Sequence, residues 1–294
     1  MATHDEVFKA CIDQPLDTIL SLASTCSNGD EEFEKEMCRR AVKHNRPDLL
    51  DHLLRNATAS SVERRSLLLL DSATYRSPLC VDIMLTYGFD INMYDDMIGG
   101  VLNRALTHRG CPESFLAWLI DERGALVNHP KDWTSKPPCL VHAVSHGTIP
   151  QMKLLVARGA DVDFSNALHC AVGCGYVDKA QYLVEEAGTS VNKPTGVARP
   201  SFWYGDAGST PLHVAAAGNE VATAEYLLQR GAHLEAKNAN GRTPLQEVEY
   251  IEEVAAAKPN PRSLPHRLRW LVGDQYRSYE GMSTLLREWE TRKE

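Results

Sequence analysis

Hydrophobic positions along the chain fall into pairs of short helical segments that recur at nearly regular intervals. In the first segment of each pair, a small or apolar residue is followed three positions later by alanine. The seven alanines are Ala10, Ala41, Ala73, Ala105, Ala143, Ala171 and Ala215. Successive alanines are 31, 32, 32, 38, 28 and 44 residues apart, so the repeating unit is close to 33 residues. A period in the thirties predicts a protein built from stacked structural repeats.

The second segment of most pairs carries two adjacent apolar residues and then ends at a glycine. These glycines are Gly88, Gly124, Gly159, Gly188 and Gly231. Because glycine has no Cβ, it fits the left-handed backbone position that follows a helix C-terminus. Each unit is therefore predicted to be two short antiparallel helices and a turn. The repeated alanine is expected where the first helices of neighbouring units approach closely.

The C-terminal half of the chain contains sequences that identify the repeat. Residues 208–219, which include Ser-Thr-Pro-Leu-His, and residues 224–232, which end in Gly-Ala, closely resemble an ankyrin repeat. Residues 241–245 open another copy, and 154–163 and 167–176 match moderately well. The resemblance implies an all-α ankyrin-repeat solenoid of about eight stacked helix-turn-helix units, closed by a helical C-terminal cap.

The array is expected over residues 1–262, with its first four copies degenerate and its best copies at 138–250. A Pro-rich break at 258–262 separates the array from two further helical stripes in residues 263–294. These stripes are interpreted as a cap, because the end of a stack needs a polar outer side. The alternative is a docking helix for a larger assembly, as in an adaptor subunit.

The resemblance implies that ligands bind at the turn tips and the inner helices on the concave side. Both stretched spacings add residues to such turns, at 128–138 and 192–208. The expected binding residues are His129, Asp132 and Trp133 in the first loop, and Arg199, Phe202, Trp203, Tyr204 and Asp206 in the second. Aromatic rings and arginine carry much of the binding energy at interfaces. The two loops are predicted to form a shared rim; alternatively, their aromatic rings fold back onto the repeats.

The turn of the third repeat is a further binding candidate. Tyr94, Asp95 and Asp96 are expected to project from its tip, where the two carboxylates would meet a basic partner. The alternative is that these acids only keep the turn solvated.

Histidines in the array have structural explanations. In the ankyrin motif that the sequence resembles, the histidine at the position of His169 and His213 forms a hydrogen bond with the backbone of a neighbouring repeat. His142 and His146 are four residues apart, which on a helix places both rings on one face. Because no third ligand completes a metal-binding set, neither a metal nor a cofactor is expected.

No recognised catalytic arrangement is present in the sequence. It contains no phosphate-binding glycine loop, no dinucleotide-binding glycine motif and no nucleophile elbow. Cys170 and Cys174 fall in the first helix of a repeat, where a reactive thiol is not expected. The alternative to a binding module is an enzyme or carrier for a small hydrophobic molecule. Its pocket would be formed by His129, Asp132, Tyr204 and Asp206 beneath Trp133 and Trp203.

Composition narrows the choice of partner. The chain has 31 Lys and Arg residues against 39 Asp and Glu, a formal charge of −8, so nucleic acid and anionic membranes are poor partners. Its eight cysteines form no Cys-x-x-Cys pair, and neither a secretory signal nor a membrane-spanning stretch is recognised. We therefore expect a monomeric cytoplasmic or nuclear protein with reduced thiols that binds a protein or peptide.

Overall fold

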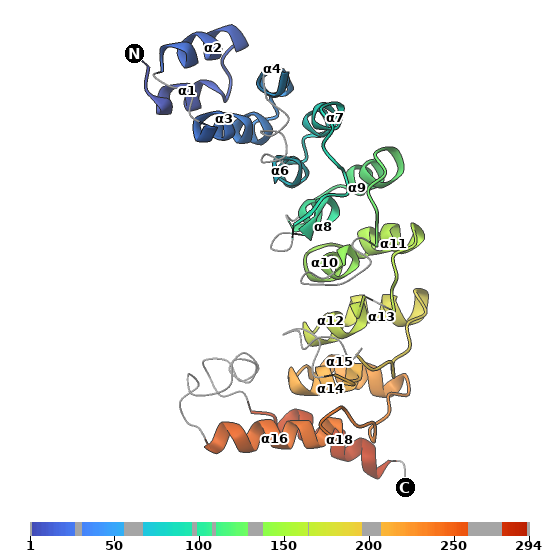
Figure 1. The fold of residues 1–294 in the computed structure, drawn as a ribbon. Helices are drawn as coiled ribbons and strands as arrows, with labels where there is room; N and C mark the ends of the chain where they lie inside the picture. The colour runs from blue at the N-terminus through green and yellow to red at the C-terminus, as the bar shows by residue number, and fades with distance from the viewer. Residues whose placement is uncertain are drawn as a thin grey trace. The chain divides into compact units, whose positions relative to one another are not determined.

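The fold is that of short helices joined by tight turns (Figure 1). The computed structural model describes residues 2–26, 31–55, 67–95, 99–107, 110–128, 138–163, 165–195, 207–257 and 278–292. Their packing divides the chain into two units, Met1–Ala160 and Asp161–Glu294. Each unit is treated by itself below.

The first unit contains five helix pairs and one hairpin among its described residues. The pairs are α1 (His4–Ala10) with α2 (Leu16–Thr25), α3 (Glu31–Lys43) with α4 (Pro47–Arg55), α6 (Leu67–Tyr75) with α7 (Pro78–Thr86), α8 (Val101–Thr107) with α9 (Glu113–Ala117), and α10 (Cys139–His146) with α11 (Ile149–Ala157). Helix α9 continues as a π-helical turn, η1 (Trp118–Glu122). The hairpin strands are β1 (Tyr94–Asp95) and β2 (Gly99–Gly100).

Helices of the first unit stack in two layers (Figure 1). The first helices α3, α6, α8 and α10 pack side by side, and the second helices α4 and α7, and α9 and α11, pack likewise. The repeated alanines of α3, α6, α8 and α10 are at most 1% exposed. Their burial confirms the prediction that these positions allow close approach of neighbouring helices.

The second unit follows the same plan. Its helices are α12 (Ala167–Gly173), α13 (Val177–Gln181) continued by the π-helical turn η2 (Tyr182–Glu186), α14 (Pro211–Ala217), α15 (Val221–Gln229), α16 (Pro244–Ala257) and α18 (Glu280–Thr291). Helix α14 packs between α12 and α16, and α18 packs on α15 and α16. The Tyr279 hydroxyl anchors the start of α18 by donating to the Ala217 carbonyl at 2.8 Å.

Local sequence signals explain where many of the helices begin. Proline is the first residue of α4, α7, α14 and α16, where its missing N–H would have had no helical partner. Thr148 caps α11: its hydroxyl accepts from the Gln151 N–H, and the Gln151 side chain accepts from the Thr148 N–H. Local signals of this kind therefore begin both first and second helices of the repeats.

The glycines that follow the second helices have the predicted backbone conformation. Gly88, Gly124, Gly159, Gly188 and Gly231 all have φ between +74° and +86°. A side chain at these positions would strain the backbone. The helix-terminating role inferred from the sequence is confirmed.

Asparagine side chains join successive repeats at the base of two turns, which the sequence analysis did not predict. Asn92 donates to the Gly124 carbonyl at 3.1 Å and accepts from the Leu126 N–H at 2.8 Å. Asn192 makes the same two bonds, to the Gly231 carbonyl and from the His233 N–H. Each asparagine thus fixes the turn that carries it to the next repeat.

Candidate functional site

The turn of the third repeat forms a hairpin, residues 90–100, which we call the finger. Strands β1 and β2 pair antiparallel, with Tyr94 opposite Gly100 and Asp95 opposite Gly99. Gly99 has φ +89°, and a Cβ there would lie 3.0 Å from the Cβ of Asn103. The finger therefore needs glycine where it joins α8. Tyr94 and Asp95 are half-buried on it, and Asp96 lies outside the described residues.

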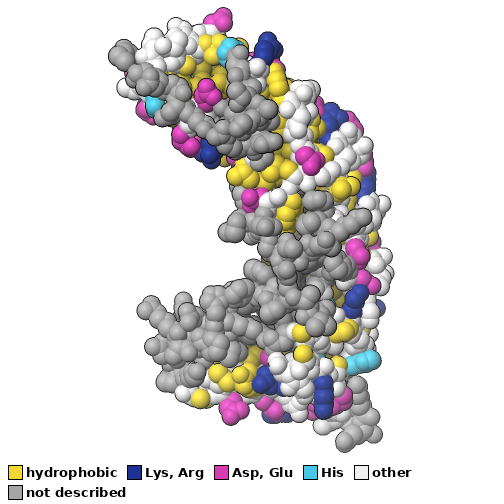
Figure 2. Space-filling view, in the orientation of Figure 1, with side chains coloured by type: hydrophobic (Ala, Val, Ile, Leu, Met, Phe, Trp, Pro, Cys, Tyr) yellow, Lys and Arg dark blue, Asp and Glu magenta, His cyan; other side chains and the backbone are white. Residues whose placement is uncertain are grey.

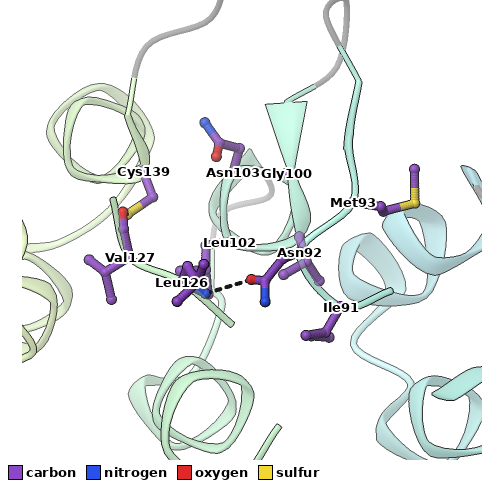
Figure 3. A pocket seen from close by; sticks show the side chains of 10 residues that line it. Ile91, Asn92, Met93, Gly100, Leu102, Asn103, Leu126, Val127 and Cys139 are labelled. Carbon is purple, nitrogen blue, oxygen red and sulfur yellow. Dashed lines mark hydrogen bonds between the residues drawn. The ribbon is translucent and has the colours of Figure 1, made fainter. Parts of the chain in front are cut away.

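A small hollow lies between the finger and the turn of the next repeat (Figure 3). The space that it encloses is about 10 Å³, enough for roughly one water molecule, although the open hollow measures about 250 Å³ with solvent included. Ligand pockets for drug-sized molecules usually occupy about 300–1,000 Å³. The lining residues are Ile91, Asn92, Met93, Gly100, Val101, Leu102, Asn103, Leu126, Val127 and Cys139. The hollow is therefore too small for a typical metabolite.

The hollow presents slightly more polar than apolar surface, and its one thiol is unreactive. Leu126 is 57% exposed at its rim, whereas Val101, Leu102 and Cys139 are buried. Burial raises the pKa of the Cys139 thiol to about 12, and the thiol donates to the Val127 carbonyl at 3.1 Å. A neutral, hydrogen-bonded thiol is a poor nucleophile.

The first long loop begins and ends beside this hollow. Residues 129–137, which include His129, Asp132 and Trp133, lie outside the described residues. The residues close to the two ends of this segment, Val127 and Cys139, both line the hollow. The structure thus brings the base of the first loop close to the finger that carries Tyr94 and Asp95.

The second long loop rises from a hydrogen-bonded stem. Thr195 and Ser209 are joined by a bond from the Thr195 N–H to the Ser209 carbonyl at 2.8 Å, and the Gly208 N–H donates back to the Thr195 carbonyl. The Ala239 N–H donates to the Ala207 carbonyl and so ties the stem to the next repeat. The loop's binding candidates, Arg199, Phe202, Trp203, Tyr204 and Asp206, lie outside the described residues. The shared rim of the two loops stays a prediction.

The two repeat histidines have the structural role that was expected. The His169 Nε2–H donates to the Ser209 carbonyl at 3.2 Å, and the His213 Nε2–H donates to the Arg242 carbonyl at 2.9 Å. His213 Nδ1 accepts from the Thr210 N–H. Burial lowers the pKa of His169 to about 4 and also lowers that of His213. Both rings are therefore neutral links between adjacent repeats.

His142 and His146 share one face of α10, with ring centroids 5.8 Å apart. Among the described residues, no three His, Cys, Asp or Glu side chains are placed to hold a metal ion. In the same part of the chain, no helix has the length and apolar character needed to span a membrane. Acidic and basic side chains are interspersed over the visible described surface (Figure 2).

Cysteine environments differ in a way that the sequence did not indicate. Burial raises the pKa of Cys80 to about 12 and that of Cys111 to about 11. The pKa of the partly exposed Cys174 is instead lowered by a hydrogen bond with Cys170. Burial and the negative charge of Glu220 oppose this shift, and the positive charge of Lys179 adds a smaller contribution in its favour. Cys174 is therefore more exposed than its place in the first helix of a repeat indicated.

Cys174 is therefore expected to react first with an alkylating agent. We expect iodoacetamide at pH 7.5 to modify it about tenfold faster than Cys80 or Cys139, because the thiolate is the reacting form. Timed alkylation of the native protein, followed by peptide mass spectrometry, measures these rates. Cys26, which is also partly exposed, serves as the internal comparison. Equal rates at Cys174 and the buried cysteines would contradict this assignment.

Comparisons with known proteins found similarity to ankyrin repeats, both in the sequence and in the fold. A model of the ankyrin repeat family matches residues 207–239. The crystal structure of the human ASB11 ankyrin repeat domain is similar, with a TM-score of 0.55 and 23% sequence identity. The match covers 71% of this chain and 90% of that chain. No curated protein sequence matches the chain.

Proposed function

Because the chain is an ankyrin-repeat protein with the all-α fold expected from its sequence, we propose that it is an interaction module for a protein or peptide partner. The finger and the first long loop of the first unit, and the second long loop of the second unit, each contact the partner. One fold hosts many roles, so the argument depends on the surface itself. We further propose that the module acts as a monomer in the cytoplasm or nucleus, and that its partner is not nucleic acid.

The observation that carries this proposal is the stem of the second loop. Backbone hydrogen bonds close the stem at Thr195 and Ser209, and the stem is fixed to the following repeat through Ala207. A loop with a fixed base loses less conformational entropy on binding than a free segment does. Phe202, Trp203 and Tyr204 follow one another in the sequence of this loop. Aromatic residues presented in this way are typical of binding hot spots.

We expect the double substitution Trp203→Ala/Tyr204→Ala to weaken partner binding by about 30-fold or more, which corresponds to roughly 2 kcal/mol. Affinity capture from the source cell with the full chain, followed by quantitative mass spectrometry, identifies the partner. Titration of that partner against each variant then gives the affinities.

Tyr75→Ala is the matched control, because Tyr75 is an exposed aromatic residue (44%) on α6 and belongs to neither loop. It should bind like the unmodified chain. If the double variant unfolds, as judged by circular dichroism, the aromatic rings pack on the repeats and the binding role is rejected. If the double variant folds and binds normally, the second loop is not part of the interface.

A further inference from the structure

We propose that Cys170 and Cys174 together form a binding site for a monosubstituted trivalent arsenical, a soft ligand that bonds to two thiols at once. The site lies in the second unit, where the chain passes from α12 to α13 (Figure 1). It goes beyond the proposed function and does not depend on the protein or peptide partner.

The two thiols lie one helical turn apart. Residues four apart on a helix are neighbours on its surface, and the Cys174 side chain is hydrogen-bonded to that of Cys170. The Cys174 N–H also donates to the Cys170 carbonyl at 3.1 Å, which keeps the end of α12 in the conformation that pairs the thiols. The two sulfur atoms are therefore already close together before a ligand binds.

Trivalent arsenic suits two thiols at this spacing. Thiolates are soft ligands that select soft acceptors. An arsenic atom bonded to two sulfurs holds them about as far apart as two hydrogen-bonded thiols are. Each As–OH bond of the arsonous acid is replaced by an As–S bond, and each thiol proton leaves with one hydroxide as water. The third substituent stays on the arsenic, and no oxidant or reductant is needed.

The number of available ligands favours this class over the common thiolate metals. Structural zinc is bound by four ligands in a tetrahedron. Over the ranges that the structure describes, no three His, Cys, Asp or Glu side chains are placed together to hold a metal ion. Inorganic arsenite, with three hydroxyl groups to replace, would gain from a third thiol. A monosubstituted arsenical has only two such groups, so two thiols satisfy it.

The site is accessible from one side. Cys174 is partly exposed, whereas Cys170 is 1% exposed. The arsenical therefore bonds first to Cys174 and then to the thiol beneath it. The Glu220 side chain lies next to Gly175, beside the site. Its negative charge disfavours an anionic ligand but not an arsonous acid, which is uncharged at neutral pH.

Cys174 is also the more reactive thiol of the pair. Its hydrogen bond with Cys170 lowers its pKa against the opposing effects of burial and Glu220, with a smaller contribution from Lys179. The Lys179 ammonium lies 4.6 Å from the centroid of the Tyr176 ring, which belongs to the same turn. Because the thiolate is the form that bonds to soft ligands, the first As–S bond is expected at Cys174.

The pairing of the thiols is what gives the site its affinity. Once arsenic is bonded to Cys174, the thiol of Cys170 is present at a high effective concentration. Two linked bonds of this kind raise affinity by about 10²–10⁴ over one. Every other two cysteines that follow one another in the sequence are at least 12 residues apart. No other cysteines of the chain therefore share a helical turn.

The test uses the full chain, with phenylarsine oxide as the probe. The native protein is titrated in an excess of the monothiol 2-mercaptoethanol, and the bound fraction is measured by native mass spectrometry. We expect one phenylarsenic group per chain, in place of two hydrogens, and its removal by the dithiol 2,3-dimercaptopropanol. Bound probe should protect Cys174 from iodoacetamide, and arsenite should bind more weakly than the probe.

Cys174→Ser and Cys170→Ala each leave one thiol at the site. Each variant should bind the probe at least about 100-fold more weakly, because only one As–S bond remains. Cys26→Ser is the matched control: Cys26 is the other partly exposed cysteine, and its replacement should leave the affinity unchanged. Circular dichroism checks folding. If the buried substitution Cys170→Ala unfolds the chain, Cys174→Ser decides the test alone.

Two outcomes would overturn the inference. One is a native chain that retains no probe in the monothiol, since a paired dithiol competes successfully with single thiols. The other is a Cys174→Ser variant that retains the probe as tightly as the unmodified chain, because the binding would then lie at other cysteines. Neither outcome affects the proposed function, whose test variant Trp203→Ala/Tyr204→Ala removes no thiol.

Discussion

Lowering the pH from 6.5 to about 4 is expected to reduce the free energy of unfolding of the second unit by about 3 kcal/mol through His169 alone. The ring is 2% exposed and donates to the Ser209 carbonyl of the next repeat. Burial lowers its pKa from an ordinary 6.5 to about 4, so the folded state resists protonation in this range.

The direction of this pH effect follows from the number of protons bound by the folded and the unfolded chain. Above pH 6.5 the ring is neutral in both states, and the contribution of the neutral link is fully present. As the pH falls below 6.5, the unfolded chain takes up a proton that the folded chain does not, so stability falls until the pH reaches the folded pKa. Below about pH 4 both states are protonated, and no further loss occurs through this group. The lowered pKa of His213 acts in the same direction.

Urea denaturation at several pH values, followed by circular dichroism, measures this effect. Carboxylates also titrate near pH 4, so the test is a difference between two proteins. His169→Gln keeps an amide that can donate to Ser209 but has no charge to gain. Between pH 6.5 and 5, the free energy of unfolding of this variant should fall less steeply than that of the unmodified chain. The difference between the two slopes should approach about 1.4 kcal/mol per pH unit. Identical slopes would show that His169 is not a buried neutral link.

Features that depend on one repeat and its immediate neighbour could be predicted from the sequence. The glycine after each second helix reports a backbone conformation that only its own turn determines, and Gly88 and Gly231 both adopt it. The histidine link is equally local to a pair of repeats, as in His213 with Arg242. Periodicity therefore predicted the helix pairs and the interface between them.

The hollow could not be predicted, because it needs the relative placement of two turns. Leu126 lies more than 30 residues from Asn92, and only their hydrogen bond places them on opposite sides of one space. The sequence shows Leu126 as one more apolar residue. The structure places it at the rim of this space, 57% exposed.

Cys174 was misjudged for a related reason. Its position in a repeat indicates a packed thiol, as for Cys170 four residues earlier. What lowers its pKa is the hydrogen bond with Cys170, with help from Lys179, which belongs to the next helix, α13. The approach of that lysine depends on the turn between α12 and α13 rather than on the helical pattern.

Ala215 is the position where the stacking of the helices leaves least room for a larger side chain. Replacing it with leucine is expected to lower the free energy of unfolding by about 3 kcal/mol, at the upper end of the usual cost of overpacking. Ala215 is 0% exposed, and its helix α14 packs between α12 and α16. The added methyl and methylene groups would force these helices apart, so the cost affects two interfaces between repeats rather than one.

Ala256→Leu is the matched control, since Ala256 is exposed on α16 and leucine has nearly the helix propensity of alanine. Its stability in urea should stay within about 0.5 kcal/mol of the unmodified chain. If Ala215→Leu were tolerated equally well, the recurring alanine would not be the point of close approach, and the period of the sequence would need another cause. A loss of stability in Ala215→Leu but not in Ala256→Leu would instead show that the recurring alanine is where neighbouring helices approach closely and share one core.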